Sequence, residues 1–291
     1  MASGCLALSA CGSAFAESFQ SNGRCPIVGF TKPFQTASAE RTAEIVSEIG
    51  WDGIECPVRP KGQIEPERVE EELPRLAEAL RGAGREIAIL STGIKSLDPL
   101  AEKVLRTASK LGIRRYRLGF WHYNTQQSLE QQIAEIRSAM RDLAALNKEL
   151  GLHGAHQNHS GVNYFGAPIW DIHQAVQEYN GDQFGICFDI GHATIEGGLS
   201  WPIQARLMRP YYMSVFVKDF RWNKSSKGWK AEWCPLGEGM VQREFFQMLK
   251  QTGYSGPICQ HHEYELGTGA AMIAAMKKDL EVLKSWMRAE Q

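Results

Sequence analysis

One local pattern recurs along this chain: an amphipathic segment reaches a glycine, and a short run rich in β-branched residues follows. A glycine in that place suits the left-handed residue that closes a helix and turns the chain into a strand. Each copy of the pattern therefore predicts a helix followed by a strand. The glycines that carry it are Gly50, Gly82 with Gly84, Gly112, Gly151, Gly181 and Gly253.

Eight strands and eight helices are expected from this pattern and from the apolar spacing. The predicted strands are 27–30, 53–56, 87–90, 116–119, 152–156, 184–189, 213–218 and 257–261. The predicted helices are 39–49, 66–81, 98–111, 128–150, 168–180, 200–209, 242–252 and 270–288. Within 128–150, Ile133, Ile136 and Met140 fall at three- and four-residue steps, as on one face of a helix. Pro74 should kink or break one of these helices.

This alternation, in a chain of 291 residues, predicts an α/β fold: a single-domain (β/α)8 TIM barrel over residues 24–291. A doubly wound open sheet shows the same alternation, but it often carries a glycine-rich phosphate loop after its first strand. Here the first strand leads to Thr31-Lys32-Pro33-Phe34, which contains no glycine. The closed barrel is therefore favoured.

The composition excludes several other classes of protein. The chain has 32 Lys and Arg against 33 Asp and Glu, a net charge of −1, so no global basic field attracts nucleic acid. No run of 18 apolar residues occurs, which argues against a membrane-spanning helix. The seven cysteines form no Cys-x-x-Cys pair, and Cys56, Cys187 and Cys259 fall on predicted strands, where we expect reduced core residues.

Residues 1–23 differ from the rest, because they are rich in small residues and contain no Lys or Arg. Ala14-Phe15-Ala16 resembles a signal-peptidase site, and Leu8-Ser9-Ala10-Cys11 resembles a lipoprotein box. A working export signal needs a positive segment before its apolar core. The segment is therefore either the remnant of an export signal or an extension of no consequence. Localisation stays open between the cytoplasm and the periplasm.

In a TIM barrel the active site lies at the carboxyl ends of the strands. The side chains expected there include Lys32, Glu55, His122, the run 156–159, Asp189, His192, Lys218, Asp219 and the run 261–263. Several tryptophans follow the later strands, and their flat faces suit the apolar face of a sugar ring. We therefore expect a small sugar as substrate. The predicted substrate-binding residues are Lys32, Glu55, Trp121, His122, Trp201 and Trp222.

Five phrases at these strand ends resemble those of the xylose-isomerase-like barrels, a superfamily of sugar isomerases and epimerases that also includes endonuclease-IV-like proteins. The resemblance covers about residues 24–288, and the phrases occur in the family's order. They are Gly50-Trp51-Asp52-Gly53-Ile54-Glu55, Asn158-His159-Ser160-Gly161, Phe188-Asp189-Ile190-Gly191-His192, Val217-Lys218-Asp219 and Pro235-Leu236-Gly237-Glu238-Gly239.

Members of this family typically hold one divalent metal with Glu, Asp, His and Glu from strands five to eight. The matching positions of this chain are Gln157, Asp189, Phe216 and His261. Glutamine cannot act as a base and phenylalanine cannot bind a metal, so the two-glutamate epimerase mechanism is in doubt. The resemblance leaves a metal site of Gln157, Asp189 and His261, a donor set that accommodates Mn, Fe or Zn.

The remaining acid–base groups, His159, His192, Lys218 and Glu263, are the predicted catalytic residues. A histidine pair can replace a glutamate pair in proton transfer. Lys218 has two readings: it stabilises an enolate or binds a carboxylate, or it forms a structural ion pair with Asp219.

The resemblance implies an enzyme that abstracts a proton next to the carbonyl of a sugar or keto-sugar, as an isomerase or epimerase. A lyase or hydratase acting on an oxidised (3-keto) sugar is the first alternative. A carbohydrate-binding barrel without catalysis is the second. An abasic-site DNA nuclease is the third, and the near-zero charge and Phe216 argue against it. An oligomer is compatible with all of these.

Overall fold

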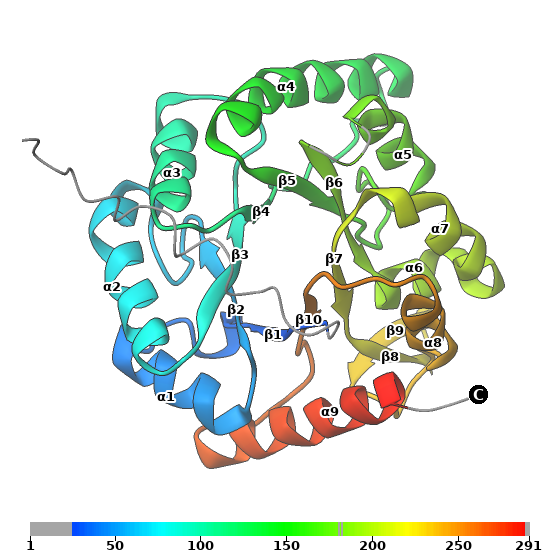
Figure 1. The fold of residues 1–291 in the computed structure, drawn as a ribbon. Coiled ribbons are helices and arrows are strands. Elements are labelled where there is room, and N and C mark those ends of the chain that lie inside the picture. The colour runs from blue at the N-terminus through cyan, green and yellow to red at the C-terminus, as the bar shows by residue number, and fades with distance from the viewer. Residues whose placement is uncertain (1–24, 180, 182, 289–291) are drawn as a thin grey trace, which may run out of the picture.

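The structure, a computed structural model, describes residues 25–179, 181 and 183–288. The expectation for residues 1–23 therefore lies outside the described residues. Eight parallel strands close into a barrel, which confirms the predicted fold class and excludes the open sheet (Figure 1). In barrel order they are β1 (Ile27–Phe30), β10 (Ile258–Gln260), β7 (Tyr212–Val217), β6 (Phe184–Asp189), β5 (His153–Gln157), β4 (Arg115–Arg117), β3 (Glu86–Thr92) and β2 (Gly53–Val58).

A ring of helices surrounds the barrel (Figure 1). They are α1 (Ala39–Ile49), α2 (Val69–Gly82), α3 (Pro99–Lys110), α4 (Leu129–Leu150), α5 (Trp170–Val176), α6 (Ile190–Gly197), α7 (Trp201–Met208), α8 (Glu244–Gln251) and α9 (Ala270–Arg288). Glycine closes two of them as predicted, because Gly50 after α1 and Gly151 after α4 have φ angles of 93° and 64°. No helix among the described residues is long and apolar enough to cross a membrane.

Pro74 does not break its helix. Helix α2 runs through it, and the preceding residues Pro66–Arg68 form a separate 3-10 turn. The missing N–H of a proline concerns the carbonyl four residues earlier, here that of Glu70. Because Glu70 lies in the first turn of α2, only one hydrogen bond near the helix end is lost and the helix continues.

An antiparallel hairpin after β7 was not predicted from the sequence. It consists of β8 (Asp219–Ser225) and β9 (Gly228–Cys234), and it lies outside the barrel sheet. Its segments do not follow the pattern of a helix closed by glycine. Helix α6 was also missed, since it begins directly at the end of β6 with no loop between them.

The apolar core has two parts. The larger part fills the space between the strands and the helices. The smaller part fills the inside of the barrel and includes Phe30, Phe216, Cys187 and Cys259. The cysteines Cys56, Cys187 and Cys259 are buried and free, as predicted. Packed side chains thus fill the barrel interior, so a ligand site is expected at the strand ends.

Candidate active site at the carboxyl end of the barrel

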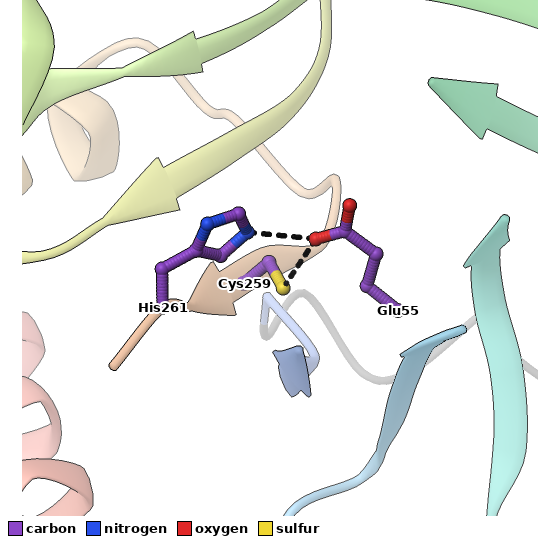
Figure 2. A group of neighbouring side chains, drawn as sticks. All are labelled: Glu55, Cys259 and His261. Atoms are coloured by element: carbon purple, nitrogen blue, oxygen red, sulfur yellow. Dashed lines mark hydrogen bonds and ion pairs between the residues drawn. The ribbon is translucent and has the colours of Figure 1, made fainter. Parts of the chain in front are cut away.

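Glu55 is the centre of a first group of polar residues, inside the barrel. Its side chain projects from β2, and one carboxylate oxygen accepts hydrogen bonds from His261 Nε2 at 2.7 Å and from Cys259 Sγ at 3.3 Å (Figure 2). The other oxygen lies 3.1 Å from Nε of Arg117, at the end of β4. Arg117 also donates to Ser91 on β3. Four strand ends are thereby joined through one carboxylate.

The charges of this first group balance one another. Burial alone would raise the pKa of Glu55, but His261 and Arg117 outweigh it and lower the pKa to about 2. The ring of His261 lies against Phe30 and Phe216, with centroid distances of 4.7 and 4.4 Å. These five side chains are buried, so Glu55 and His261 lie beneath the surface that a substrate first meets.

Asp189 is the centre of a second group, at the ends of β5, β6 and β7. One of its carboxylate oxygens accepts from Gln157 Nε2 at 2.8 Å and lies 3.3 Å from Lys218 Nζ. The other accepts from the backbone N–H of His192 at 3.1 Å. The amide of Asn158 pairs with both backbone groups of Asp189, at 2.8 and 2.9 Å, and so fixes β5 against β6.

His159 and His192 form a pair of imidazoles beside Asp189, with ring centroids 4.0 Å apart. His159 Nδ1 lies 2.8 Å from the carbonyl of Ser160, which can only accept, so Nδ1 carries the proton and Nε2 keeps a lone pair. The backbone N–H of Ser160 donates to His192 Nδ1 at 3.1 Å, so the proton of the neutral His192 is on Nε2. The two rings therefore hold opposite tautomers.

Both imidazoles are neutral near pH 7. Burial lowers the pKa of His159 to about 4, and the positive charge of Lys218 adds to this effect. Burial and Lys218 also hold the pKa of His192 well below its ordinary value. His159 is half-buried while His192 is fully buried, so of the two it is His159 that a ligand can contact.

Aromatic rings and a second ion pair border this group. Tyr164 stacks on His159 with centroids 4.4 Å apart, and the ammonium of Lys218 lies 4.6 Å from the ring centroid of Trp233 on β9. After β10, Glu263 pairs with Lys32 at 2.9 Å. Burial would raise the pKa of Glu263, but Lys218 and Lys32 lower it overall, so its carboxylate stays ionised.

The remaining predicted residues lie further out. Trp121 packs against His156 and Phe165, and His122 is exposed beside Tyr164. Trp201 is buried against Phe245 of α8, so the structure does not bring it to the strand ends.

The hairpin contains two more of the residues considered above. Trp222 lies on β8 and is exposed. Asp219 accepts backbone hydrogen bonds from Phe220, Gly237, Gly239 and Val241, which gives it a structural role in the loop after the hairpin. Lys218 pairs with Asp189, which answers the question of its ionic partner.

Sequence reasoning missed Arg117, Ser160, Tyr164 and Trp233 as site residues. Arg117 carried a signal, because a charged residue inside a predicted barrel strand needs a buried partner. Trp233 was recognised only as one of several loop tryptophans. Its place beside Lys218 depends on the β8–β9 hairpin, which no local sequence pattern predicted.

The predicted metal ligands do not fit a divalent metal as they lie. Gln157 and Asp189 are joined, but an ammonium group already occupies the carboxylate of Asp189. His261 turns to Glu55 instead, and Phe216 offers a ring at the fourth position. One carboxylate with a bound cation is a poor environment for a second cation.

Within the described ranges, one group has donors placed closely enough for a metal: Glu55, Cys259 and His261, whose ligand atoms lie within 4.8 Å of one another. Such a mixture of oxygen, sulfur and nitrogen donors is typical of zinc. Two features oppose it, since Arg117 already neutralises Glu55 and burial raises the pKa of the Cys259 thiol well above its ordinary value. A metal would have to compete with both.

Comparison with known proteins agrees with this architecture. The family model described as a xylose isomerase-like TIM barrel matches residues 43–286. No curated protein sequence matches the chain. Many solved structures share the fold, and three of them illustrate the similarity at low identity. An apo 3-keto-D-glucoside 4-epimerase from E. coli has 15% identity and a TM-score of 0.70, covering 90% of this chain and 100% of its own.

A probable 3-DHS dehydratase from Bacillus anthracis has 16% identity and a TM-score of 0.69, covering 89% of this chain and 98% of its own. A xylose isomerase-like TIM barrel protein from Mycobacterium smegmatis, solved in complex with magnesium, has 17% identity and a TM-score of 0.65. It covers 90% of this chain and 98% of its own. The similarity in all three cases is one of fold.

Proposed function

This chain belongs to the xylose isomerase-like TIM-barrel family, and we propose that it is a sugar isomerase- or epimerase-like enzyme that removes a proton next to the carbonyl of a sugar or keto-sugar. The observation that carries the proposal is the pair of opposite tautomers, His159 and His192, beside the Asp189–Lys218 ion pair. A free imidazole lone pair and a cation placed together suit the formation of an enolate.

In this proposal His159 is the general base. Its pKa of about 4 keeps Nε2 free to accept a proton at neutral pH, and the hydrogen bond of Nδ1 to Ser160 holds the ring in place. Lys218 stabilises the negative charge that develops on the substrate oxygen, and Asp189 positions its ammonium group. His192 is a positioning residue, because its backbone N–H donates to Asp189 and its buried ring lies 2.7 Å from the hydroxyl of Ser160.

Glu263 is the second proton-transfer group. Its ionised carboxylate, held by Lys32, follows β10 and approaches from a different strand than His159. Return of the proton to the opposite face of the same carbon gives an epimer, and return to the neighbouring carbon gives an isomer. Loss of a hydroxyl group from the enolate instead gives elimination, which is the lyase or hydratase alternative.

The solved neighbours support both outcomes: one is named a 3-keto-D-glucoside 4-epimerase and another a probable dehydratase. The divalent metal expected from the resemblance, Mn, Fe or Zn, has no step in the proposal, because Lys218 already pairs with Asp189 and His261 Nε2 bonds to Glu55. Calorimetric titration with Mn²⁺ or Zn²⁺ tests this part directly. Stoichiometric binding that requires Asp189 would contradict it.

Solvent exchange tests the proposed chemistry. The protein is incubated in D₂O with methyl 3-keto-D-glucoside or D-psicose, and NMR follows deuterium at the carbon next to the carbonyl. We expect exchange by the wild type and a loss of about 10²-fold or more in His159→Ala. His173→Ala is the matched control, since His173 lies on α5 against Tyr211.

Other outcomes distinguish the alternatives. Sugar binding with no exchange and no turnover would make the chain a carbohydrate-binding barrel. Full activity in both Asp189→Ala and His261→Ala would overturn the assignment of these strand ends as the active site. Cleavage of abasic DNA would revive the nuclease alternative.

A further inference from the structure

The β8–β9 hairpin carries its aromatic residues on one face. Residues paired across an antiparallel hairpin point to the same side, and residues two apart along a strand do so as well. The register pairs Phe220 with Trp233, Trp222 with Ala231, and Lys224 with Trp229. These six residues therefore share one face, which we call the aromatic face.

The aromatic face begins at the candidate active site. Trp233 lies at its inner end, where its ring contacts His192 with centroids 5.2 Å apart and lies under the ammonium of Lys218. Phe220 continues the row, 6.3 Å from Trp233 and 5.6 Å from Trp222. Catalytic groups and hairpin are thus joined by a continuous row of rings.

The outer end of the aromatic face is open to solvent. Trp222 is 43% exposed and Trp229 is 66% exposed, although both are large apolar side chains. Opposite Trp222 stands Ala231, whose side chain is only a methyl group. Lys224 lies over Trp229, with Nζ 5.8 Å from the ring centroid, and supplies a hydrogen-bond donor at the tip.

The opposite face of the hairpin is polar. Arg221 pairs with Glu238, and Asn223 donates to Glu232. Aromatic residues are therefore confined to the side that continues from the active site. Trp233 and Trp229 are four positions apart along β9, a span of about 13 Å, which is longer than one sugar ring.

We propose that the aromatic face binds the second sugar ring of a glycoside whose oxidised ring lies beside His159 and Lys218. This inference rests on the proposed function and extends it from a single sugar to a disaccharide or larger glycoside. Flat indole rings stack on the apolar face of a pyranose, and Lys224 is placed to contact its hydroxyls. A second copy of the chain and a membrane surface are competing occupants of the same face.

Binding of D-glucose and of cellobiose separates these occupants. Indole N–H signals of the ¹⁵N-labelled full chain are followed by NMR, with affinities from calorimetry. We expect cellobiose to shift the signals of Trp222 and Trp229 and to bind about tenfold more tightly than glucose, a difference of ~1.4 kcal/mol. Trp222→Ala should remove that difference, Trp222→Tyr should retain most of it, and Trp170→Ala on α5 is the control for an exposed tryptophan.

Three results would overturn the inference. The first is equal affinity for glucose and cellobiose. The second is self-association that Trp229→Ala abolishes, and the third is binding to phosphatidylcholine vesicles that Trp229→Ala abolishes. The readout is binding, so it is independent of turnover. If His159→Ala and the wild type are both inactive but cellobiose selectivity still requires Trp222, the proposed chemistry fails and the second sugar site stands.

Discussion

Two charged groups occupy the same barrel, and they differ in how completely their atoms are paired. Around Glu55, both carboxylate oxygens are taken by Arg117, His261 and Cys259, and apolar rings enclose the whole. Around Asp189, the carboxylate is also paired, but the neighbouring His159 keeps a free lone pair and is only half-buried. The first group is suited to hold strands together, and the second to act on a ligand.

The difference also shows in how each group uses electrostatics. The positive charges of His261 and Arg117 stabilise the ionised carboxylate of Glu55 and outweigh the effect of its burial. Like charge from Lys218 and burial keep His159 and His192 neutral. A general base must be unprotonated at the working pH, and the neutral His159 meets that condition, so the second group is suited to accept a proton.

As pH falls, the buried histidines should reduce the stability of the fold at a higher pH than Glu55 does. Burial lowers the pKa of His156 and His262 to about 3 and of His159 to about 4, and holds that of His192 well below its ordinary value. The unfolded chain binds these protons below pH 6.5, so stability is lost as pH falls through this range. In this range each such histidine lowers the free energy of unfolding by ~1.4 kcal/mol per pH unit.

Buried aspartates with raised pKa values, such as Asp279, partly offset this loss. We therefore expect about 4–6 kcal/mol less stability at pH 5 than at pH 7, measured by urea unfolding. The contribution of Glu55, with a pKa of about 2, should persist to much lower pH. Constant stability from pH 7 to 5 would show that the histidines are not held neutral.

Removing Glu55 tests the structural role of the first group. Glu55→Ala leaves Arg117 buried without its charge partner, and we expect a loss of about 3–5 kcal/mol in the free energy of unfolding. The double variant Glu55→Ala/Arg117→Met should recover a good part of this loss, because the unpaired charge is gone. A single variant as stable as the wild type would contradict the assignment. Glu40→Ala, on the exposed surface of α1, is the control.

The sequence predicted the barrel strands and several residues at their ends, but not the partners that these residues take. All eight barrel strands were predicted, because helix, glycine and strand are local signals. Strand ends therefore gave Asp189, His159 and Lys218. Which partner each would take was not readable, since His261 could face Asp189 or Glu55, and the choice depends on side-chain packing against Phe30 and Phe216.

Other features depend on contacts that span many residues. The tautomers of His159 and His192 are fixed by the backbone of Ser160, which no composition or spacing reveals. Trp201 was placed at the site from its position after a strand, but it packs on α8. Trp233 reaches the site only because β9 pairs with β8, which begins directly after Lys218.

Replacing His159 should change activity and leave stability nearly intact. We expect His159→Ala to lower kcat by about 10²–10³-fold, within the range for a lost general base. The wild-type pH profile should stay flat from pH 7 to about 5 and fall below it, because the pKa of His159 is about 4. An unchanged kcat in a folded variant, or an acid limb near pH 6.5, would assign the base elsewhere.

A third group, His262 with Asp279 behind β10, lies between the two extremes. Tyr264 donates to Asp279 at 2.9 Å, but the other carboxylate oxygen and both nitrogens of His262 have no hydrogen-bond partner among the described residues. Burial raises the pKa of Asp279 to about 6. The folded state therefore binds a proton that the unfolded state releases, and this stability is lost as pH rises from about 4 to 6.

Asp279→Asn should remove that loss. The amide oxygen can still accept from Tyr264, and no charge is buried at pH 7. We expect the variant to be about 1–2 kcal/mol more stable than the wild type at pH 7, with the gain vanishing near pH 4, as measured by urea unfolding. A destabilised variant at pH 7 would mean that the carboxylate is needed in its charged form, paired with a protonated His262 at their 3.5 Å separation. In that case the His262–Asp279 group would be fully paired, like the group around Glu55. Pairing rather than burial would then decide the charge of Asp279.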